Sequence, residues 1–200
     1  MGLETGKKNY MLLDDFLPTF DFNEVHVISV RASRDRIFHS IKDLTPAEIS
    51  LLRLLFAIRS LPARLAGKTR RSVEHSRPLL QQLLGNGFIL LAESPNQELV
   101  FGTIGQFWKL MGNVSARIAD ASGFLAFGQP DYAKVAMNFS LEETPGVKRI
   151  RVRTETRIFV PDPATRKKFA RYWRIIYPGS ALIRRMWLRA IKQRAEQEPG

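Results

Sequence analysis

Histidines and carboxylates are the residues of this chain whose chemistry suits catalysis or metal binding, because the sequence contains no cysteine. The three histidines, His26, His39 and His75, do not stand at the spacing that places two metal ligands on one face of a helix. No HExxH pattern or carboxylate cluster accompanies them. We therefore predict no metal site, and the absence of cysteine also excludes disulfides and thiol nucleophiles.

Three carboxylates, Glu93, Asp120 and Glu155, are candidates for general acid–base catalysis if they point into a dry pocket. Glu155 alternates with arginines along an expected strand, so we expect it to form an ion pair on the wet face instead. The sequence has no GxSxG, P-loop or GxGxxG motif, since Gly102 and Gly105 are too close together and lie between strands. We predict no catalytic residue and no cofactor, and enzymatic activity stays an open alternative.

Basic residues outnumber acidic ones by 31 to 19, which gives the chain a net charge of +12. Fifteen basic and four acidic residues fall in 148–200, so almost all of the excess belongs to the last quarter of the chain. A localised basic surface attracts phosphate-bearing partners, whereas a solvated helix face only aids solubility. On the expected last helix this basic surface consists of Arg184, Arg185, Arg189 and Lys192.

Hydrophobic periodicity predicts one strand, then helices, then a run of strands and a last helix. Strands are expected over 24–32, 88–93, 98–103, 135–142 and 150–158, and helices over 33–41, 46–61, 77–84 and from Pro163 onward, with a break at Pro178-Gly179. The two longest strands alternate apolar with polar residues, which is typical of an antiparallel sheet with one buried and one wet face. This order of elements indicates an α+β fold.

A chain of 200 residues is expected to form one domain, over 23–196, after an extended lead-in over 1–22. Its first residues lack the apolar core that a secretory signal requires. The longest apolar stretch runs only from Ile49 to Ile58, whereas a membrane span needs about 20 residues. We therefore expect no transmembrane segment, and the absence of cysteine fits the reducing conditions of the cytoplasm.

The order of these elements, together with three segments, resembles the START-like or SRPBCC superfamily over residues 22–195. The segments are GFILLAESPNQELVFGTIGQFW, FGQPDYAKVAMNFSLEE and RTETRIFVPDPATRKKFARYWRII. The resemblance implies a helix-grip fold, in which a curved antiparallel sheet surrounds a long C-terminal helix with a ligand cavity between them. Members of the superfamily bind lipids, sterols, polyketides or other apolar molecules, and some are cyclases. This chain departs from the family in its very apolar helix over 46–61 and in the Pro178-Gly179 break, so the class of ligand is not carried over.

Given this resemblance, we expect aromatic, methionine and threonine side chains to line the cavity: Trp108, Met137, Phe139, Thr154, Thr156, Phe169, Trp173 and Met186. The two threonines would supply the few polar groups that orient a mostly apolar ligand. Leu52 and Phe56, on the apolar helix, are expected to form part of a lid. The alternative is that these side chains only fill the core.

The leading functional hypothesis is a non-enzymatic protein that binds a hydrophobic or amphiphilic small molecule, lipid-like or polyketide-like, between sheet and helix. A second hypothesis is a cyclase or dehydratase that uses the same cavity. A third is docking of the basic last helix on nucleic acid or on an anionic membrane. For that helix we expect weak, salt-sensitive contacts and no specific nucleic acid. The sequence makes no prediction about the identity of the ligand or the oligomeric state.

Overall fold

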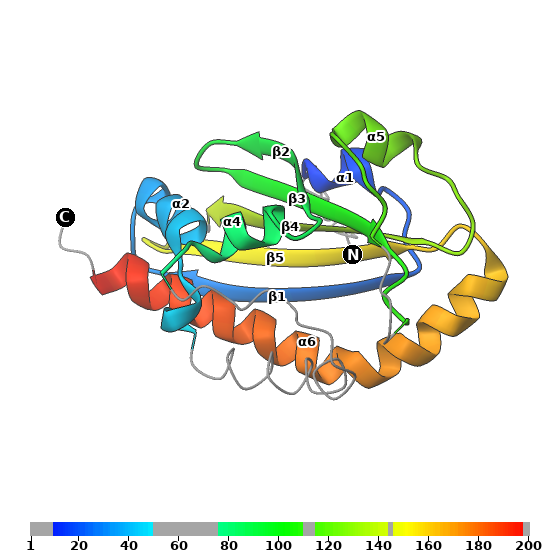
Figure 1. Ribbon diagram of the computed structural model, residues 1–200. Coiled ribbons are helices and arrows are strands. Elements are labelled where there is room, and N and C mark those ends of the chain that lie inside the picture. Colours follow the sequence, from blue (N-terminus) through cyan, green and yellow to red (C-terminus); the bar gives the residue numbers. More distant parts are fainter. Residues whose placement is uncertain (1–9, 50–75, 110–114, 144–145, 198–200) are drawn as a thin grey trace, which may run out of the picture.

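The computed structural model describes residues 10–49, 76–109, 115–143 and 146–197 of the chain (Figure 1). The described elements, in chain order, are α1 (Leu13–Phe16), β1 (Phe22–Val30), α2 (Arg34–Asp43), the 3₁₀ turn η1 (Pro46–Glu48), α4 (Leu79–Leu84), β2 (Ile89–Ser94), β3 (Glu98–Gly105), α5 (Ala121–Ala126), β4 (Ala133–Glu143), β5 (Ile150–Phe159) and α6 (Pro163–Gln197). They form an α+β fold that combines an antiparallel sheet with a long C-terminal helix, as the pattern of the sequence predicts.

The five described strands form one sheet in the order β1-β5-β4-β3-β2, and every neighbouring pair is antiparallel. The first strand pairs with the last, so that Phe22 lies opposite Ile158. The hairpin between β2 and β3 turns through Asn96, whose φ of 60° is one that asparagine tolerates better than most residues. The predicted antiparallel arrangement is therefore confirmed for these strands.

Polar side chains begin the helices where the sequence predicts them to do so. The Ser33 hydroxyl accepts a hydrogen bond from the backbone N–H of Arg36 at 3.3 Å, which caps α2. The Asp162 carboxylate accepts one from the backbone N–H of Thr165 at 2.7 Å at the start of α6. This hydrogen bond and a second from the backbone of Asp131 lower the pKa of Asp162 to about 2.

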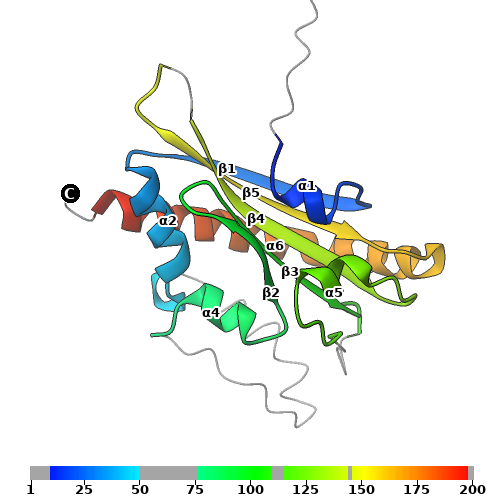
Figure 2. The same ribbon diagram turned by 90° about the horizontal axis from the view of Figure 1, so that it is seen from above.

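The helices pack on two different sides of the sheet. On the helix-facing side, α2, α4 and the C-terminal half of α6 contribute a cluster with strand residues, among them Ile37, Ile41, Leu79, Leu99, Phe139, Trp187 and Ile191. On the opposite side, α1 and α5 contribute a second cluster, which contains Leu13, Phe16, Leu91, Val100, Ile104 and Phe124. Figure 2 shows α2 and α4 on one side of the strands and α1 on the other.

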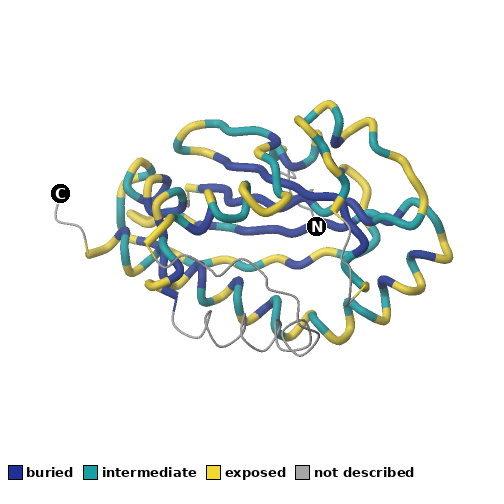
Figure 3. Tube along the Cα trace, in the orientation of Figure 1, coloured by how far each residue is buried: buried dark blue, intermediate teal, exposed yellow. Residues whose placement is uncertain are grey.

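The two longest strands are buried on both faces, which corrects the expectation of one wet face (Figure 3). Side chains do alternate between the two sides, since Met137 and Phe139 belong to the helix-facing cluster and Ala136 to the other. The residues expected to be wet, Glu155 and Arg157, are nevertheless buried. The reason is that α1 lies over this face, so the lead-in segment is part of the packed structure.

Gly102 on β3 allows α5 to pack closely on the side of the sheet that carries α1 and α5. A Cβ atom at this position would lie 2.7 Å from Cδ1 of Leu91 and 2.9 Å from Cε2 of Phe124. Both distances are shorter than a carbon–carbon contact permits, because such atoms are optimally about 3.5–4.0 Å apart. The absence of a side chain at Gly102 therefore brings α5 against the sheet.

The last helix is continuous from Pro163 to Gln197, which corrects the predicted break at Pro178-Gly179. Proline within a helix removes one backbone hydrogen bond and bends the helix axis without necessarily ending it. Figure 1 shows that α6 changes direction near its middle while it follows the sheet. Phe169 packs on one end of the sheet and Ile191 on the other, so both halves of the helix are anchored.

Where an apolar helix over 46–61 was expected, the described residues form the 3₁₀ turn Pro46–Glu48, in which Glu48 Oε2 accepts a hydrogen bond from the Thr45 backbone N–H at 2.8 Å. The turn ends at Ile49, whose backbone is extended, and residues 50–61 lie outside the described residues. The proposed lid residues Leu52 and Phe56 lie outside the described residues. Among the helices in the described part of the chain, none is both long enough and apolar enough to cross a membrane.

Candidate functional site

Four of the eight expected lining residues come together on the helix-facing side of the sheet. The register of β4 and β5 places Met137 opposite Thr156 and Phe139 opposite Thr154. All four are buried. The Thr154 hydroxyl donates a hydrogen bond to the backbone carbonyl of Asn138 at 2.7 Å, so its proton is already used within the sheet.

The other expected lining residues do not join this group. Trp108, Phe169 and Trp173 form a separate aromatic cluster with Phe22, in which the ring centroids of Trp108 and Phe169 are 6.1 Å apart. Met186 is half-buried at the margin of the helix-facing cluster. The expected lining residues are therefore divided between two ends of the sheet.

Arg184 is buried, which corrects its assignment to the basic surface of the last helix. The buried residues of α6 include a stripe at helical spacing, formed by Ala181, Arg184, Leu188, Ile191 and Ala195. Arg184 is only 6% exposed, whereas Arg185 and Arg189 are exposed as expected. Lys192 is half-buried and donates a hydrogen bond to the backbone carbonyl of Ser29 at 2.8 Å.

The Arg184 guanidinium makes its direct contacts with groups that carry no charge. Its Nη2 atom is 2.9 Å from Oγ1 of Thr156 and 2.7 Å from Sδ of Met137. Its Cζ atom is 5.6 Å from the centroid of the Trp187 ring, and its Nη1 atom has no hydrogen-bond partner. Burial lowers the pKa of Arg184 to about 10, although the negative charge of Glu24 opposes this shift. The side chain therefore stays positively charged at neutral pH.

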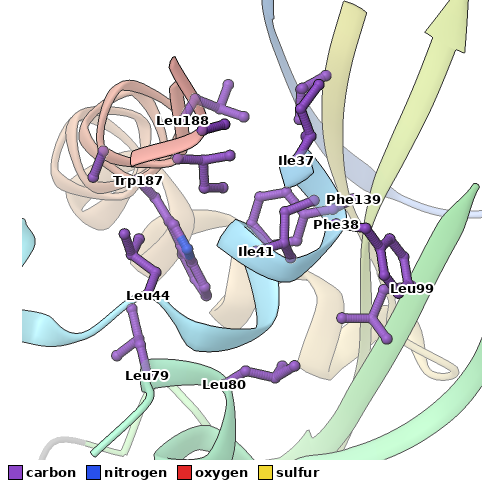
Figure 4. Packing of buried hydrophobic residues seen from close by; sticks show 14 of the residues in the cluster. Ile37, Phe38, Ile41, Leu44, Leu79, Leu80, Leu99, Phe139, Trp187 and Leu188 are labelled. Atoms are coloured by element: carbon purple, nitrogen blue, oxygen red, sulfur yellow. The ribbon is translucent and has the colours of Figure 1, made fainter. Parts of the chain in front are cut away.

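Trp187, one helical turn beyond Arg184, is a second buried donor without a partner. Its indole reaches from α6 towards α2, between Leu44 and Ile41 (Figure 4). Its ring packs edge-to-face on Phe139 with the centroids 5.0 Å apart. Its Nε1 atom has no hydrogen-bond partner. Two buried N–H donors on adjacent turns of one helix thus lack acceptors.

A buried carboxylate completes the polar group on this side. Glu24 lies opposite Thr156 on the neighbouring strand. Its Oε1 atom is 2.6 Å from Nε2 of His26, and its Oε2 atom accepts a hydrogen bond from the Ser180 hydroxyl at 2.8 Å. The Arg184 cluster is the name we give to these residues together: Glu24, His26, Thr156, Ser180, Arg184 and Trp187.

Sequence reasoning missed four members of the Arg184 cluster. Along β1, Glu24 and His26 face the interior while Val25 and Val27 are exposed, the reverse of the order that hydropathy favours. A signal for this orientation is Val30, an apolar residue at an even position of the strand, because alternate residues share a face and Glu24 and His26 therefore lie on the same face as Val30. Ser180 directly follows the expected break at Pro178-Gly179, and Trp187 is an apolar residue in an amphipathic helix, so neither position indicates a polar site.

A second polar group, the Arg157 network, lies on the opposite side of the sheet. Arg157 Nε is 3.0 Å from Oε1 of Glu155, and its Nη1 is 2.7 Å from Oδ1 of Asp14. Burial opposes the charge of Glu155, but hydrogen bonds from Arg157 and Arg153 outweigh it and lower the pKa of Glu155. Burial likewise opposes the charge of Arg157, and the two carboxylates raise its pKa. This network attaches α1 to the sheet.

The three carboxylates considered for catalysis all have partners away from the Arg184 cluster. Glu155 belongs to the Arg157 network, where the expected ion pair forms in a buried setting. Glu93 is 2.8 Å from Nζ of Lys42. Asp120 caps α5 by accepting a hydrogen bond from the backbone N–H of Gly123 at 2.8 Å. Within the described ranges, no group of three or more histidines and carboxylates is arranged to hold a metal ion.

Comparisons with known proteins do not add a family or a function. No family model and no curated protein matches the chain. A protein from Chromobacterium violaceum is 8% identical with a TM-score of 0.41, covering 89% of this chain and 100% of its own. A protein from Mesorhizobium loti is 14% identical with a TM-score of 0.38, and the match covers 88% of this chain and 100% of that protein. A hypothetical protein from Helicobacter pylori is 8% identical with a TM-score of 0.42, and the match covers 91% of this chain and 93% of that protein. At such low TM-scores, these likenesses support no further assignment.

Proposed function

We propose that the chain is a START-like, helix-grip protein that binds a hydrophobic or amphiphilic small molecule between its sheet and α6. The observation that carries the proposal is the Arg184 cluster, in which buried donors of Arg184 and Trp187 lack acceptors. Buried polar groups are nearly always hydrogen-bonded, and an exception calls for an explanation. A ligand that supplies the acceptors is such an explanation.

The surroundings of the cluster support an apolar ligand. Aromatic rings continue from Trp187 to Phe139 and Phe101, whose centroids are 6.3 Å apart. Small-molecule sites are mostly apolar, and a few polar groups orient the ligand in them. The Arg184 cluster has this composition. The carboxylates considered for acid–base chemistry are engaged elsewhere, so no observation favours the cyclase or dehydratase alternative.

Contact quenching of tryptophan fluorescence tests the proposal. A brominated long-chain alcohol quenches an indole that it touches, and the chain contains three tryptophans. In a variant that combines Trp108→Phe with Trp173→Phe, Trp187 is the remaining emitter and we expect saturable quenching. The matched Trp187→Phe variant retains the other two tryptophans, and we expect little quenching. Absence of saturable quenching in the first variant, or equal quenching in both, would count against the site.

Exposed arginines on α6 support a subsidiary property, contact with anionic surfaces. Arg185 and Arg189 are exposed, and Ile175 beside the basic residue Arg174 is 79% exposed. Because the charges are at the surface, salt screens them over about 8 Å near 0.15 M ionic strength. We expect the protein to sediment with phosphatidylserine vesicles at low salt and to be released at that ionic strength. Binding that withstands the salt would contradict this expectation.

A further inference from the structure

We infer that the ligand carries a carboxylate head group, which pairs with Nη1 of Arg184 and accepts a second hydrogen bond from Nε1 of Trp187. This inference rests on the proposed function and specifies the chemistry of the same site. Both donors are buried, both lack an acceptor, and they stand one turn apart on α6. The two oxygens of a carboxylate match two donors.

The Arg184 guanidinium has no carboxylate in direct contact with it, which favours an anionic ligand. Arg184 remains protonated at neutral pH, and among the described residues no carboxylate lies within the 4.0 Å of an ion pair with it. The negative charge of Glu24 raises the pKa of Arg184, but the two oxygens of this carboxylate already contact His26 and Ser180. A buried charge without a partner is costly, because the interior solvates it poorly. A ligand anion removes this cost on binding.

Neutral and multiply charged head groups fit the cluster less well. An alcohol or a carbonyl satisfies one donor but leaves the guanidinium charge unpaired. A phosphate brings up to two negative charges and three oxygens, whereas the cluster offers it a single guanidinium. Nη2 of that guanidinium already contacts Thr156 and Met137, which leaves Nη1 for the ligand. The residues that pack around Trp187 are apolar, with Met186 at the margin of the helix-facing cluster and Phe139 against the indole. The ligand class is therefore an apolar monocarboxylic acid.

Calorimetric titration with decanoate and with decanol at pH 7 separates the head group from the chain. We expect the wild-type protein to bind decanoate about tenfold or more tightly than decanol, as a charged hydrogen bond permits. Arg184→Met keeps an apolar side chain of similar length, so it should abolish this preference while decanol binding remains. Trp187→Phe should reduce the preference less. Arg185→Met, an exposed neighbour, should leave it unchanged.

Each outcome of this experiment separates the two proposals. Equal binding of acid and alcohol by the wild type, or a preference that survives Arg184→Met, overturns the carboxylate inference and leaves the proposed function standing. Binding of neither compound overturns both. Circular dichroism and thermal unfolding establish that each variant folds. If Arg184→Met does not fold, the preference must fall in Trp187→Phe and persist in Arg185→Met, or the inference is wrong.

Discussion

Arg157 and Arg184 are both buried against the same sheet, on opposite sides, yet they have opposite electrostatic environments. Arg157 is 1% exposed and donates to Glu155, to Asp14 and to the backbone carbonyl of Leu17. Arg184 is 6% exposed and contacts a threonine, a methionine and an indole. The pKa of Arg157 is raised by its carboxylates, whereas burial lowers the pKa of Arg184 to about 10.

On the proposed function, the difference is that between a structural arginine and one that binds a ligand. The charge of Arg157 is compensated within the chain, and its partner Asp14 belongs to α1, so the ion pair contributes to holding that helix. The charge of Arg184 is not compensated by a carboxylate within ion-pair distance among the described residues. The proposed binding site therefore rests on a buried group whose desolvation the protein does not offset, and not on the aromatic residues around it.

The largest effect is expected from Arg157→Met. The substitution removes one cation from Asp14 and from the buried Glu155, which keeps Arg153 at 2.6 Å. Removing one partner of a buried ion pair costs about 3–5 kcal/mol, and we expect a loss towards the lower end of this range. Urea unfolding should show this loss. Arg151→Met is the matched control on the same strand, because Arg151 is exposed and lies 3.9 Å from its acidic neighbour Glu142. A loss no larger than that of the control would show that the Arg157 network is not structural.

A smaller loss is expected from Gly102→Ala on the same side of the sheet. The added methyl group meets Leu91 and Phe124 at less than 3.0 Å, so α5 must shift. Overpacking of this kind costs about 1–3 kcal/mol. Gly128→Ala is the control, because a Cβ there meets nothing within 4 Å. Equal stability of the two variants would mean that the opposite side is more loosely packed than the structure indicates.

The Arg157 network should contribute to the acid sensitivity of folding. Because the pKa of Glu155 is lower in the folded chain than its ordinary value of 4.5, its contribution is present above pH 4.5 and is lost as the pH falls below it. In Glu155→Gln, the free energy of unfolding should depend less on pH in this range. Glu143→Gln, at a mostly exposed ion pair with Arg34, serves as the control. Unchanged pH dependence in Glu155→Gln would assign acid sensitivity elsewhere.

The smallest effect on stability is expected from Arg184→Met, in contrast to Arg157→Met. Replacing an uncompensated buried charge by an apolar side chain removes its desolvation penalty, so the free energy of unfolding should change by less than about 1 kcal/mol or increase. Thermal unfolding without added ligand is the measurement. A loss comparable to that of Arg157→Met would mean that Arg184 is structural, and the comparison between the two arginines would fail.

Local signals in the sequence are sufficient for most of the strands and helix starts. Ser33 and Asp162 predict where helices begin, because a cap needs only the following three residues. The alternation around Met137 and Thr156 predicts a hairpin, and its register brings those two residues together. Within the described residues, these expectations are confirmed.

Long-range packing accounts for what the sequence did not predict. The pattern of Arg153, Glu155 and Arg157 has the same alternation as a wet face, and only the docking of α1 makes that face buried. This docking depends on Glu98, which accepts hydrogen bonds from the backbone N–H groups of Leu12 and Leu13 at 2.7 and 3.3 Å. No local pattern indicates such a contact.

The Arg184 cluster was missed for a similar reason. Glu24 approaches Ser180 and Thr156 because β1 pairs with β5 and α6 crosses both, and a single sequence does not show which strands are neighbours. In addition, an arginine in a basic helix is normally assigned to the surface. The helical spacing from Ala181 to Leu188 marks position 184 as buried only once the helix is known to continue through Pro178.

The pairing of the first strand with the last also governs the order in which the chain acquires its structure during synthesis. β1 is made early, but β5, its neighbour among the described strands, ends at Phe159. Until that segment has left the ribosome, β1 lacks the strand with which it pairs in the described sheet. Contacts so distant in sequence also form slowly. We therefore expect the nascent chain to expose an unpaired strand until β5 has been made, and a stall before β5 to leave a species prone to aggregation.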